Sequence, residues 1–335
     1  MTETYLPYIW AGLIAVAVLA YVLLDGFDLG VGLLFPTANK GTERDMMMNS
    51  VAPVWDGNET WLVLGGGGLL AAFPLAYSII MPALYAPIIA MLLGLVLRGV
   101  AFEFRWRTKR GQFVWDGAFF AGSAIATFAQ GIALGALVQG IPIAGRSYGG
   151  GWWNWLTPFS LLTGFALLVG YGLLGATWLY WKTQGELQKR VRHQARVLGP
   201  LLLAAIGVVS LWTPFLNPIY FTRWFAWPAA LFSAIMPVLV LATALQFWRG
   251  LQRSSEAVPL IATLTIFILC FIGIGISFYP YMVPPNLTIA QAAAPYASLS
   301  FMLPGIIVLL PVILSYTAFS YWIFRGKVSE DAGYH

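Results

Sequence analysis

Two carboxylic acids and an amide stand at the start of a long apolar segment of this sequence. Asp56, Asn58 and Glu59 lie within APVWDGNETWLVL, which runs from residue 52 to residue 64 and leads into a run of glycines. A charged side chain at the centre of a membrane helix costs about 2.5–3.5 kcal/mol on insertion scales, and less near the helix ends. Acids in such a segment are therefore candidates for a functional site, and their partners must be found elsewhere in the chain.

Five further ionisable groups fall in or beside neighbouring apolar segments. Asp25 and Asp28 have the i, i+3 spacing that places both on one helix face, and so do Asp56 and Glu59. The best partner for an Asp of the first two segments is Arg98, because a guanidinium presents a rigid fork to carboxylates. The remaining two groups are Glu103 and Asp116.

One arginine cannot neutralise six carboxyl groups, so in a helical bundle some of these acids must be protonated or hydrated. Such a cluster can hold and pass protons, and the proton-pathway candidates are Asp25, Asp56, Glu59 and Asp116. It can also simply pin the helices together, and the structural charge partners are then Asp28, Arg98 and Glu103. Both interpretations stay open on the sequence alone, although the deepest acid, Asp25, favours proton transfer.

The composition predicts the elements that position these residues. The chain has 335 residues, of which 59% are hydrophobic and 9% charged, whereas a soluble domain carries about 25% charged residues. Apolar stretches of about 20 residues recur along its length, as crossing a bilayer in helical form requires. The chain is therefore expected to be an all-α integral membrane protein. Its net charge of +5 does not indicate nucleic-acid binding, because the basic residues fall at the ends of the expected helices.

Hydropathy predicts nine transmembrane helices. Their expected ranges are 8–34, 54–73, 78–103, 114–139, 157–181, 197–216, 225–248, 258–280 and 299–324. We expect one membrane domain, 1–335, built as a four-helix bundle with the acids (8–139), a second four-helix bundle (157–280) and a ninth helix.

Basic residues predict the orientation of the helices. The connections after odd-numbered spans hold Lys40, Arg44, Arg105, Arg107, Lys109, Arg110, Lys182, Lys189, Arg190, Arg192, Arg196, Arg249, Arg253, Arg325 and Lys327. The connections after even-numbered spans hold only Arg146 and Arg223. Because cytoplasmic loops carry the excess of Lys and Arg, the N-terminus is expected outside and the C-terminus in the cytoplasm. All seven ionisable groups of the cluster then share the cytoplasmic leaflet.

Few residues in the sequence could hold a cofactor. The only histidines are His193, in a basic stretch expected to be a loop, and His335, so a haem held by a buried His of this chain is not expected. The single cysteine, Cys270, cannot form a cysteine metal site, and no metal site is expected. The run Gly65–Gly68 is not followed by Lys and Ser or Thr, so it indicates helix packing rather than phosphate binding.

Two long motifs resemble a known family. The motifs are DGFDLGVG (25–32) and NSVAPVWDGNETWLVLGGG (49–67), and Arg98, Phe102 and Glu103 follow them. Together with QGIP (139–142) and YWIF (321–324), they make the chain resemble subunit II of the cytochrome bd-type quinol oxidases over nearly its whole length.

The resemblance implies a nine-helix protein of a bacterial-type cytoplasmic (inner) membrane that pairs with a haem-bearing subunit I. Subunit I would hold haem b558, haem b595 and haem d, and this chain would hold no haem ligand and no catalytic residue of its own. The complex would oxidise quinol and reduce O2 to water in the respiratory chain. The resemblance also associates Asp25 and Asp56 with a proton route from the cytoplasm, with Arg98 as charge partner. A bound quinone, lipids and a small single-helix accessory subunit are further partners that the family suggests.

The short outer loops, and Glu59 where some family members have Gln, resemble the branch described as cyanide-insensitive. Two other functions remain alternatives. A secondary transporter could use the acids as a coupling site, but its midplane site would require broken helices in matching halves. A purely structural membrane assembly partner would need the cluster only to hold its helices together.

Overall fold

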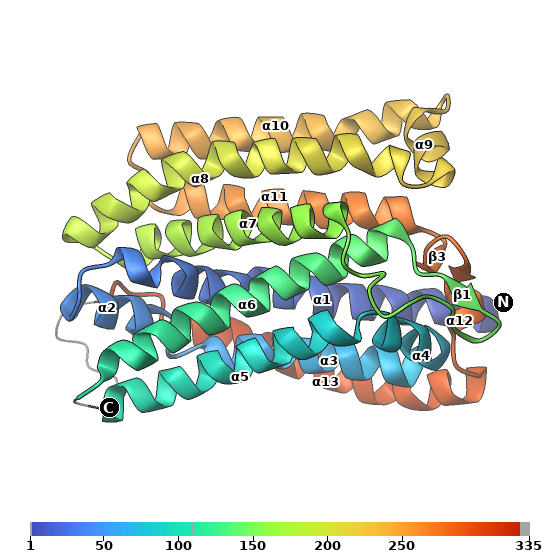
Figure 1. Ribbon diagram of the computed structural model, residues 1–335, viewed down its shortest axis with the longest axis horizontal. Coiled ribbons are helices and arrows are strands. Elements are labelled where there is room, and N and C mark those ends of the chain that lie inside the picture. Colours follow the sequence, from blue (N-terminus) through green and yellow to red (C-terminus); the bar gives the residue numbers. More distant parts are fainter. Residues whose placement is uncertain (1, 109, 329–335) are drawn as a thin grey trace.

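The computed structural model describes residues 2–108 and 110–328. Lys109 and His335, both named above, lie outside the described residues. Long helices run side by side along the longest axis of the molecule (Figure 1). The all-α prediction is confirmed for the described chain, apart from two short hairpins.

Nineteen elements make up the fold in chain order. The first half forms α1 (Thr2–Leu34), the 3₁₀ turn η1 (Phe35–Thr37), α2 (Thr42–Val51), α3 (Trp55–Ala72), α4 (Pro74–Ala83), α5 (Tyr85–Arg107) and α6 (Gln112–Gln139). The second half forms α7 (Pro158–Lys182), α8 (Gly185–Trp212), η2 (Thr213–Phe215), α9 (Pro218–Phe225), α10 (Ala229–Gln252), α11 (Ala257–Phe278), α12 (Ile289–Ala292) and α13 (Tyr296–Ile323). Antiparallel hairpins β1 (Ile143–Ala144) with β2 (Ser147–Tyr148), and β3 (Tyr281–Val283) with β4 (Leu287–Thr288), follow α6 and α11.

Eight segments of the described chain are long and apolar enough to cross a membrane. They are Tyr5–Thr37, Tyr85–Arg107, Gln112–Gln139, Pro158–Lys182, Gly185–Phe215, Ser233–Gln252, Ala257–Phe278 and Tyr296–Ile323. The predicted span 54–73 is also a helix, α3, but its first turns contain Asp56, Asn58 and Glu59, which lower its hydropathy. The structure therefore gives a multi-pass membrane protein in which α3, the helix that carries Asp56 and Glu59, is not among these eight apolar segments.

The two ends of the molecule differ in charge. One end holds α2, and the N-terminus lies at the opposite end together with α4, α9, α12 and both hairpins (Figure 1). We call the first the α2 end; α5, α7 and α10 end there and α8 begins there. These helix ends carry Arg105, Arg107, Lys182, Lys189 and Arg249, whereas Arg146 and Arg223 lie at the opposite end. The helices thus alternate in direction as the basic connections predict.

Glycines bring α1 and α7 into close contact. A Cβ added to Gly30 would lie 1.9 Å from the Tyr171 carbonyl oxygen, and one added to Gly175 would lie 2.2 Å from the Gly30 carbonyl carbon. Only residues without a side chain allow such an approach of two helix backbones. Gly26 and Gly30 of DGFDLGVG therefore face α7, whereas Gly32 faces Ser123 on α6. Asp25 in the same motif reaches Arg98 on α5.

The third predicted span, 78–103, is wrong at its start. Two helices cover it, because α4 ends at Ala83 and α5 begins at Tyr85. Pro87 explains the break: its ring would clash with the carbonyl of residue 83 in a continuous helix, and it has no N–H to donate. The seventh predicted span, 225–248, is likewise replaced by α9 and by α10 (Ala229–Gln252).

The basic stretch before the sixth predicted span is helical, so the expectation that His193 lies in a loop is wrong. Helix α8 begins at Gly185, twelve residues before the predicted start at 197. Leu187, Val191 and Ala195 are buried at i, i+4 and i+8, which gives the charged segment an apolar face against the bundle. The high proportion of basic residues hid this periodicity from a hydropathy reading.

Candidate functional site

Arg98 joins three helices at the α2 half of the molecule. It lies on α5 with only 1% of its side chain exposed, and its Nη1 is 2.5 Å from Oδ1 of Asp25 on α1. Its Nη2 is 3.0 Å from Oε2 of Glu59 on α3, whose side chain is 30% exposed. The predicted pairing of Arg98 with an Asp of the first two segments is confirmed. The guanidinium fork also holds a second acid that reaches the surface of the chain.

Asp28 belongs to a second set of contacts beside this pair. Asn58 on α3 donates from Nδ2 to Oδ2 of Asp28, at 2.7 Å. The Tyr321 hydroxyl on α13 donates to Oδ1 of Asn58, at 2.8 Å. Helix α13 is otherwise mostly exposed, with Leu299 its only buried residue. The hydrogen bond through Asn58 therefore connects the last helix to the acids of the first.

Two carboxyl oxygens in this group have no hydrogen-bond partner among the described residues. They are Oδ2 of Asp25 and Oδ1 of Asp28, on side chains that are 0% and 2% exposed. Leaving a buried polar atom unpaired costs about 1–3 kcal/mol, and more for a charged group. Because one guanidinium faces the three carboxyls of Asp25, Asp28 and Glu59, these two oxygens are the places where a proton or a water molecule would be bound.

Asp116 lies in a separate ion-pair cluster at the α2 end. Arg105 contacts Asp116 through Nε at 2.6 Å and Asp45 through Nη1 at 2.7 Å. Arg44 contacts the other oxygen of Asp116, also at 2.6 Å, and both guanidinium groups lie over the Phe35 ring. The expectation that Arg98 is the sole cation for six acids is therefore wrong, because two arginines at helix ends turn inward to Asp116. The structure does not bring Asp116 together with Asp25.

Asp56 and Glu103 lie at the surface rather than in the buried group. Asp56 is exposed on the first turn of α3, one turn before Glu59, and makes no ion pair within the described part of the chain. The Glu103 side chain is 63% exposed, and its closest cation is Arg107 at 3.9 Å. The predicted cluster is thus divided: Asp25, Asp28, Glu59 and Arg98 meet in the interior, and Asp56 stands beside them at the surface.

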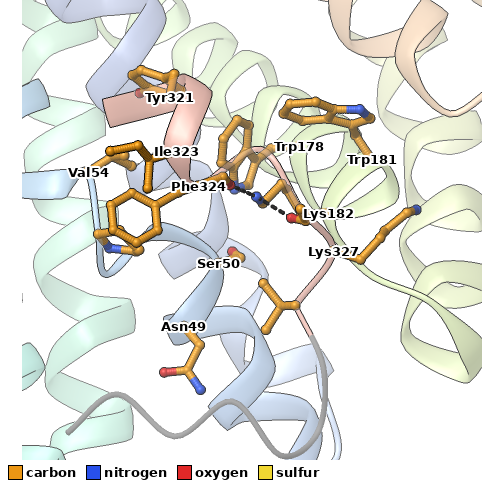
Figure 2. A pocket seen from close by; sticks show the side chains of 13 residues that line it. Asn49, Ser50, Val54, Trp178, Trp181, Lys182, Tyr321, Ile323, Phe324 and Lys327 are labelled. Carbon is orange, nitrogen blue, oxygen red and sulfur yellow. Dashed lines mark hydrogen bonds between the residues drawn. The ribbon is translucent and has the colours of Figure 1, made fainter. Parts of the chain in front are cut away.

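A cavity of about 310 Å³ opens at the α2 end, where the end of α13 lies against α7 and α2 (Figure 2). Tyr321 and Trp178 line it, and their rings lie edge to face with centroids 6.1 Å apart. Lys182 also lines it and donates to the carbonyl oxygens of Phe324 and Gly326, so it holds the end of α13 against α7. The Tyr321 hydroxyl, which bonds Asn58, therefore stands between this cavity and the buried Asp28.

The segment after α13 is fastened at this end of the molecule by a second lysine. Lys327 pairs with Glu256 at 2.8 Å and donates to the Thr183 carbonyl at 3.0 Å. The hydrogen bond from Lys327 lowers the pKa of the Glu256 carboxyl below its ordinary value. The carboxylate therefore remains ionised at neutral pH, and the tie persists there.

Sequence reasoning missed most of the neutral members of the network. Asn58 was named with the acids, but the other neutral members were not: Tyr21, Gln130, Tyr171 and Tyr321, from four different helices. Helices outside the bundle 8–139 that was expected to hold the acids also contribute, since Tyr171 lies on α7 and Tyr321 on α13. One signal was available: Tyr21 precedes Asp25 by four residues, which places both on one helix face.

Among the described residues there is no buried His that could ligate a haem. Haem iron needs an axial ligand such as His, and His193 on α8, at the α2 end, is the one histidine in the described ranges. The same ranges contain no group of three His, Cys, Asp or Glu residues that could hold a metal ion.

Fold and site together define a multi-pass helical membrane protein with a buried arginine–carboxyl group near one end. Residues 6–324 match the model of one family, cytochrome bd terminal oxidase subunit II. The chain belongs to this family.

Individual relatives agree with the family match. The chain is 29% identical to cytochrome bd-I ubiquinol oxidase subunit 2 of Escherichia coli (strain K12), over 97% of this chain and 96% of the relative. It is 30% identical to cytochrome bd ubiquinol oxidase subunit 2 of Bacillus subtilis (strain 168), over 96% of each. The fold matches a chain of the bd oxidase structure from Geobacillus thermodenitrificans with a TM-score of 0.80, at 18% identity, over 96% of this chain and 99% of that one. The predicted resemblance is confirmed, and the chain is a subunit of an oxidoreductase of electron transport.

Proposed function

We propose that this chain is the non-haem subunit II of a terminal oxidase that oxidises quinol and reduces O2 to water. Its partner, subunit I, holds the haems b558, b595 and d and supplies the redox chemistry. The α2 end faces the cytoplasm of a bacterial-type inner membrane, and α3 is the ninth span. The basic residues at this end support that orientation. The proposal includes contacts with lipids, a quinone and a small single-helix accessory subunit.

The further part of the proposal is that the buried acids form a proton entry from the cytoplasm. Reduction of O2 to water consumes protons as well as electrons, and a water-poor interior must pass them between fixed groups. The observation that carries this proposal is the pair of unpartnered oxygens on Asp25 and Asp28, which are nearly fully buried but connected to the surface. Ionisable residues inside membrane helices commonly mark such proton relays.

In the proposed route each residue has a distinct task. Exposed Asp56 collects a proton from the cytoplasmic side, and Glu59, on the same face one turn later, passes it inward. Arg98 holds Glu59 and Asp25 on either side of its guanidinium, so the two carboxyls keep a fixed separation. Asp25 then binds the proton at Oδ2, and Asp28 offers Oδ1 as a second acceptor supplied from the cavity side.

The Arg105–Asp116 cluster is better suited to a structural role. Two guanidinium groups hold both oxygens of Asp116, so this carboxylate is charge-paired and has no free oxygen for an incoming proton. It ties α2, α5 and α6 together at the α2 end. We therefore assign to the Arg105–Asp116 cluster the structural role, holding helices together, that the sequence analysis considered for all seven ionisable groups.

Co-expression tests the assignment to an oxidase complex. Purified alone, the chain is expected to show no haem absorption and no quinol oxidase activity, since it lacks buried His ligands. Co-expressed with the haem-bearing subunit of its own operon or source, it is expected to co-purify with haem and restore oxidase activity. Haem absorption in the isolated chain would contradict the proposed division of labour.

Replacing Asp56 by Asn tests the entrance of the proton route. The change removes a surface carboxyl without a buried partner, so the assembled complex is expected to keep its haem content and thermal stability while O2 reduction slows several-fold. Glu186→Gln is the matched control, because Glu186 is also an exposed acid at the α2 end and its ion pair is with Lys189, at 2.7 Å. Oxygen consumption of both variants, normalised to haem, gives the comparison. Equal rates in the two variants would remove Asp56 from the route.

A further inference from the structure

A chain of neutral polar side chains lies beside Asp25 in the membrane core. Tyr21 on α1, Gln130 on α6 and Tyr171 on α7 are connected by two hydrogen bonds of 2.8 and 3.0 Å. Tyr21 is 4% exposed and Tyr171 is fully buried. Three helices thus contribute polar atoms to one buried line that the proton route described above does not use.

Both hydrogen bonds of this chain point toward α1. The Tyr171 hydroxyl donates to Oε1 of Gln130, and Nε2 of Gln130 donates to the Tyr21 hydroxyl oxygen. Tyr21 therefore acts as the acceptor of Gln130 and keeps its own proton for a further partner. The Asp25 carboxyl lies within the hydrogen-bonding range of that proton, and burial makes an unused donor costly.

This acceptor lies one turn along the same helix. Tyr21 and Asp25 have i, i+4 spacing on α1, and Asp25 is an electrostatic neighbour of the Tyr21 hydroxyl. Oδ1 of Asp25 is taken by Arg98, but Oδ2 is buried and unpartnered. A small rotation of either side chain would satisfy a buried donor and a buried acceptor at once.

We propose that Tyr21 donates a hydrogen bond to Oδ2 of Asp25, and that Gln130 and Tyr171 hold the Tyr21 hydroxyl in the orientation that this requires. Tyr21 is then a positioning residue for Asp25, and this inference rests on the proposed role of Asp25 in proton entry. Gln130 lies between the hydroxyls of Tyr171 and Tyr21, and both hydrogen bonds are donated toward Tyr21. This arrangement orients Tyr21, and through it Asp25, and does not carry protons past Asp25. The line of hydrogen bonds from Tyr21 through Gln130 therefore ends at Tyr171.

Tyr21→Phe in the complete oxidase complex tests this assignment, because it removes only the hydroxyl. Infrared difference spectra between low and high pH identify the carboxyl band of Asp25 by its loss in Asp25→Asn. In Tyr21→Phe the carboxyl band of Asp25 is expected to shift, and turnover to fall about tenfold, as loss of one hydrogen bond to a charged group implies. Tyr8→Phe, the same change on the same helix outside the chain of hydrogen bonds, is expected to change neither.

The outcomes separate this inference from the proposed function. An Asp25 band that stays in place in Tyr21→Phe overturns the hydrogen bond, even if turnover falls, because a purely structural role of Tyr21 would lower turnover without moving the carboxyl band. If Tyr21→Phe does not assemble, Tyr171→Phe at the far end of the chain is expected to give a smaller shift in the same direction, and no shift there overturns the inference. Normal turnover in Asp25→Asn would instead refute the proton route, while a band shift would still support the contact.

Discussion

Replacing Asp25 by Asn is expected to slow O2 reduction by about 10² or more while the complex keeps its haems. Asparagine has nearly the shape of aspartate but cannot bind and release a proton, so a relay through this residue would stop. The assembled complex should survive the change, because Glu59 remains as a carboxylate partner of Arg98 at 3.0 Å. Steady-state oxygen consumption per haem is the measurement.

Asp116→Asn is the matched control for this experiment. It makes the same change in a carboxylate that two arginines hold at 2.6 Å, in the separate cluster at the α2 end. It is expected to lower the thermal stability and yield of the complex without a selective loss of turnover per haem. Loss of haem together with activity in Asp25→Asn would indicate a structural role for Asp25 instead.

Replacing Arg98 by Leu is expected to produce the largest loss of stability, about 3–5 kcal/mol. The guanidinium is 1% exposed and pairs with Asp25 and Glu59, so its removal leaves a buried carboxylate without a cation. This one side chain joins α1, α3 and α5 through its two ion pairs. The measurement is the thermal denaturation temperature of the purified complex, together with its haem content.

A second substitution separates the charge effect from the loss of packing. In the double variant Arg98→Leu with Asp25→Asn, the uncompensated charge of Asp25 is gone, so part of the lost stability is expected to return. Arg98→Lys should retain the charge but lose the two-sided fork, and is expected to be intermediate. A single Arg98→Leu complex as stable as the wild type would contradict the structural account of this ion pair.

The membrane class and the central ion pair could be predicted because each rests on a strong local signal. Apolar runs of span length set the helices, and the one arginine within the early spans had to find an acid in its own membrane leaflet. The helix boundaries at Pro87 and Gly185 were harder to predict. At the first, a proline divides an apolar run, and at the second a charged helix continues beyond the apolar segment.

The rest of the site depends on contacts that no local pattern encodes. Tyr321 and Asn58 are 263 residues apart in sequence, and their hydrogen bond exists only because α13 returns to α3. Neutral side chains such as Gln130 carry no hydropathy signal strong enough to separate a network member from a solvated or helix-packing residue. Asp116 was misplaced for a different reason, since Arg44 and Arg105 at helix ends could have faced the solvent but turn inward.

The most direct test of the central claim is proton uptake by the oxidase reconstituted in lipid vesicles. A pH-sensitive dye on the side of the α2 end reports protons taken up when reduced enzyme meets O2. We expect fast proton uptake by the wild type and by Tyr8→Phe. In Asp25→Asn with its haems intact, we expect proton uptake to be slowed about as strongly as O2 reduction. Uptake from that side at the wild-type rate in Asp25→Asn would contradict the proposed proton entry.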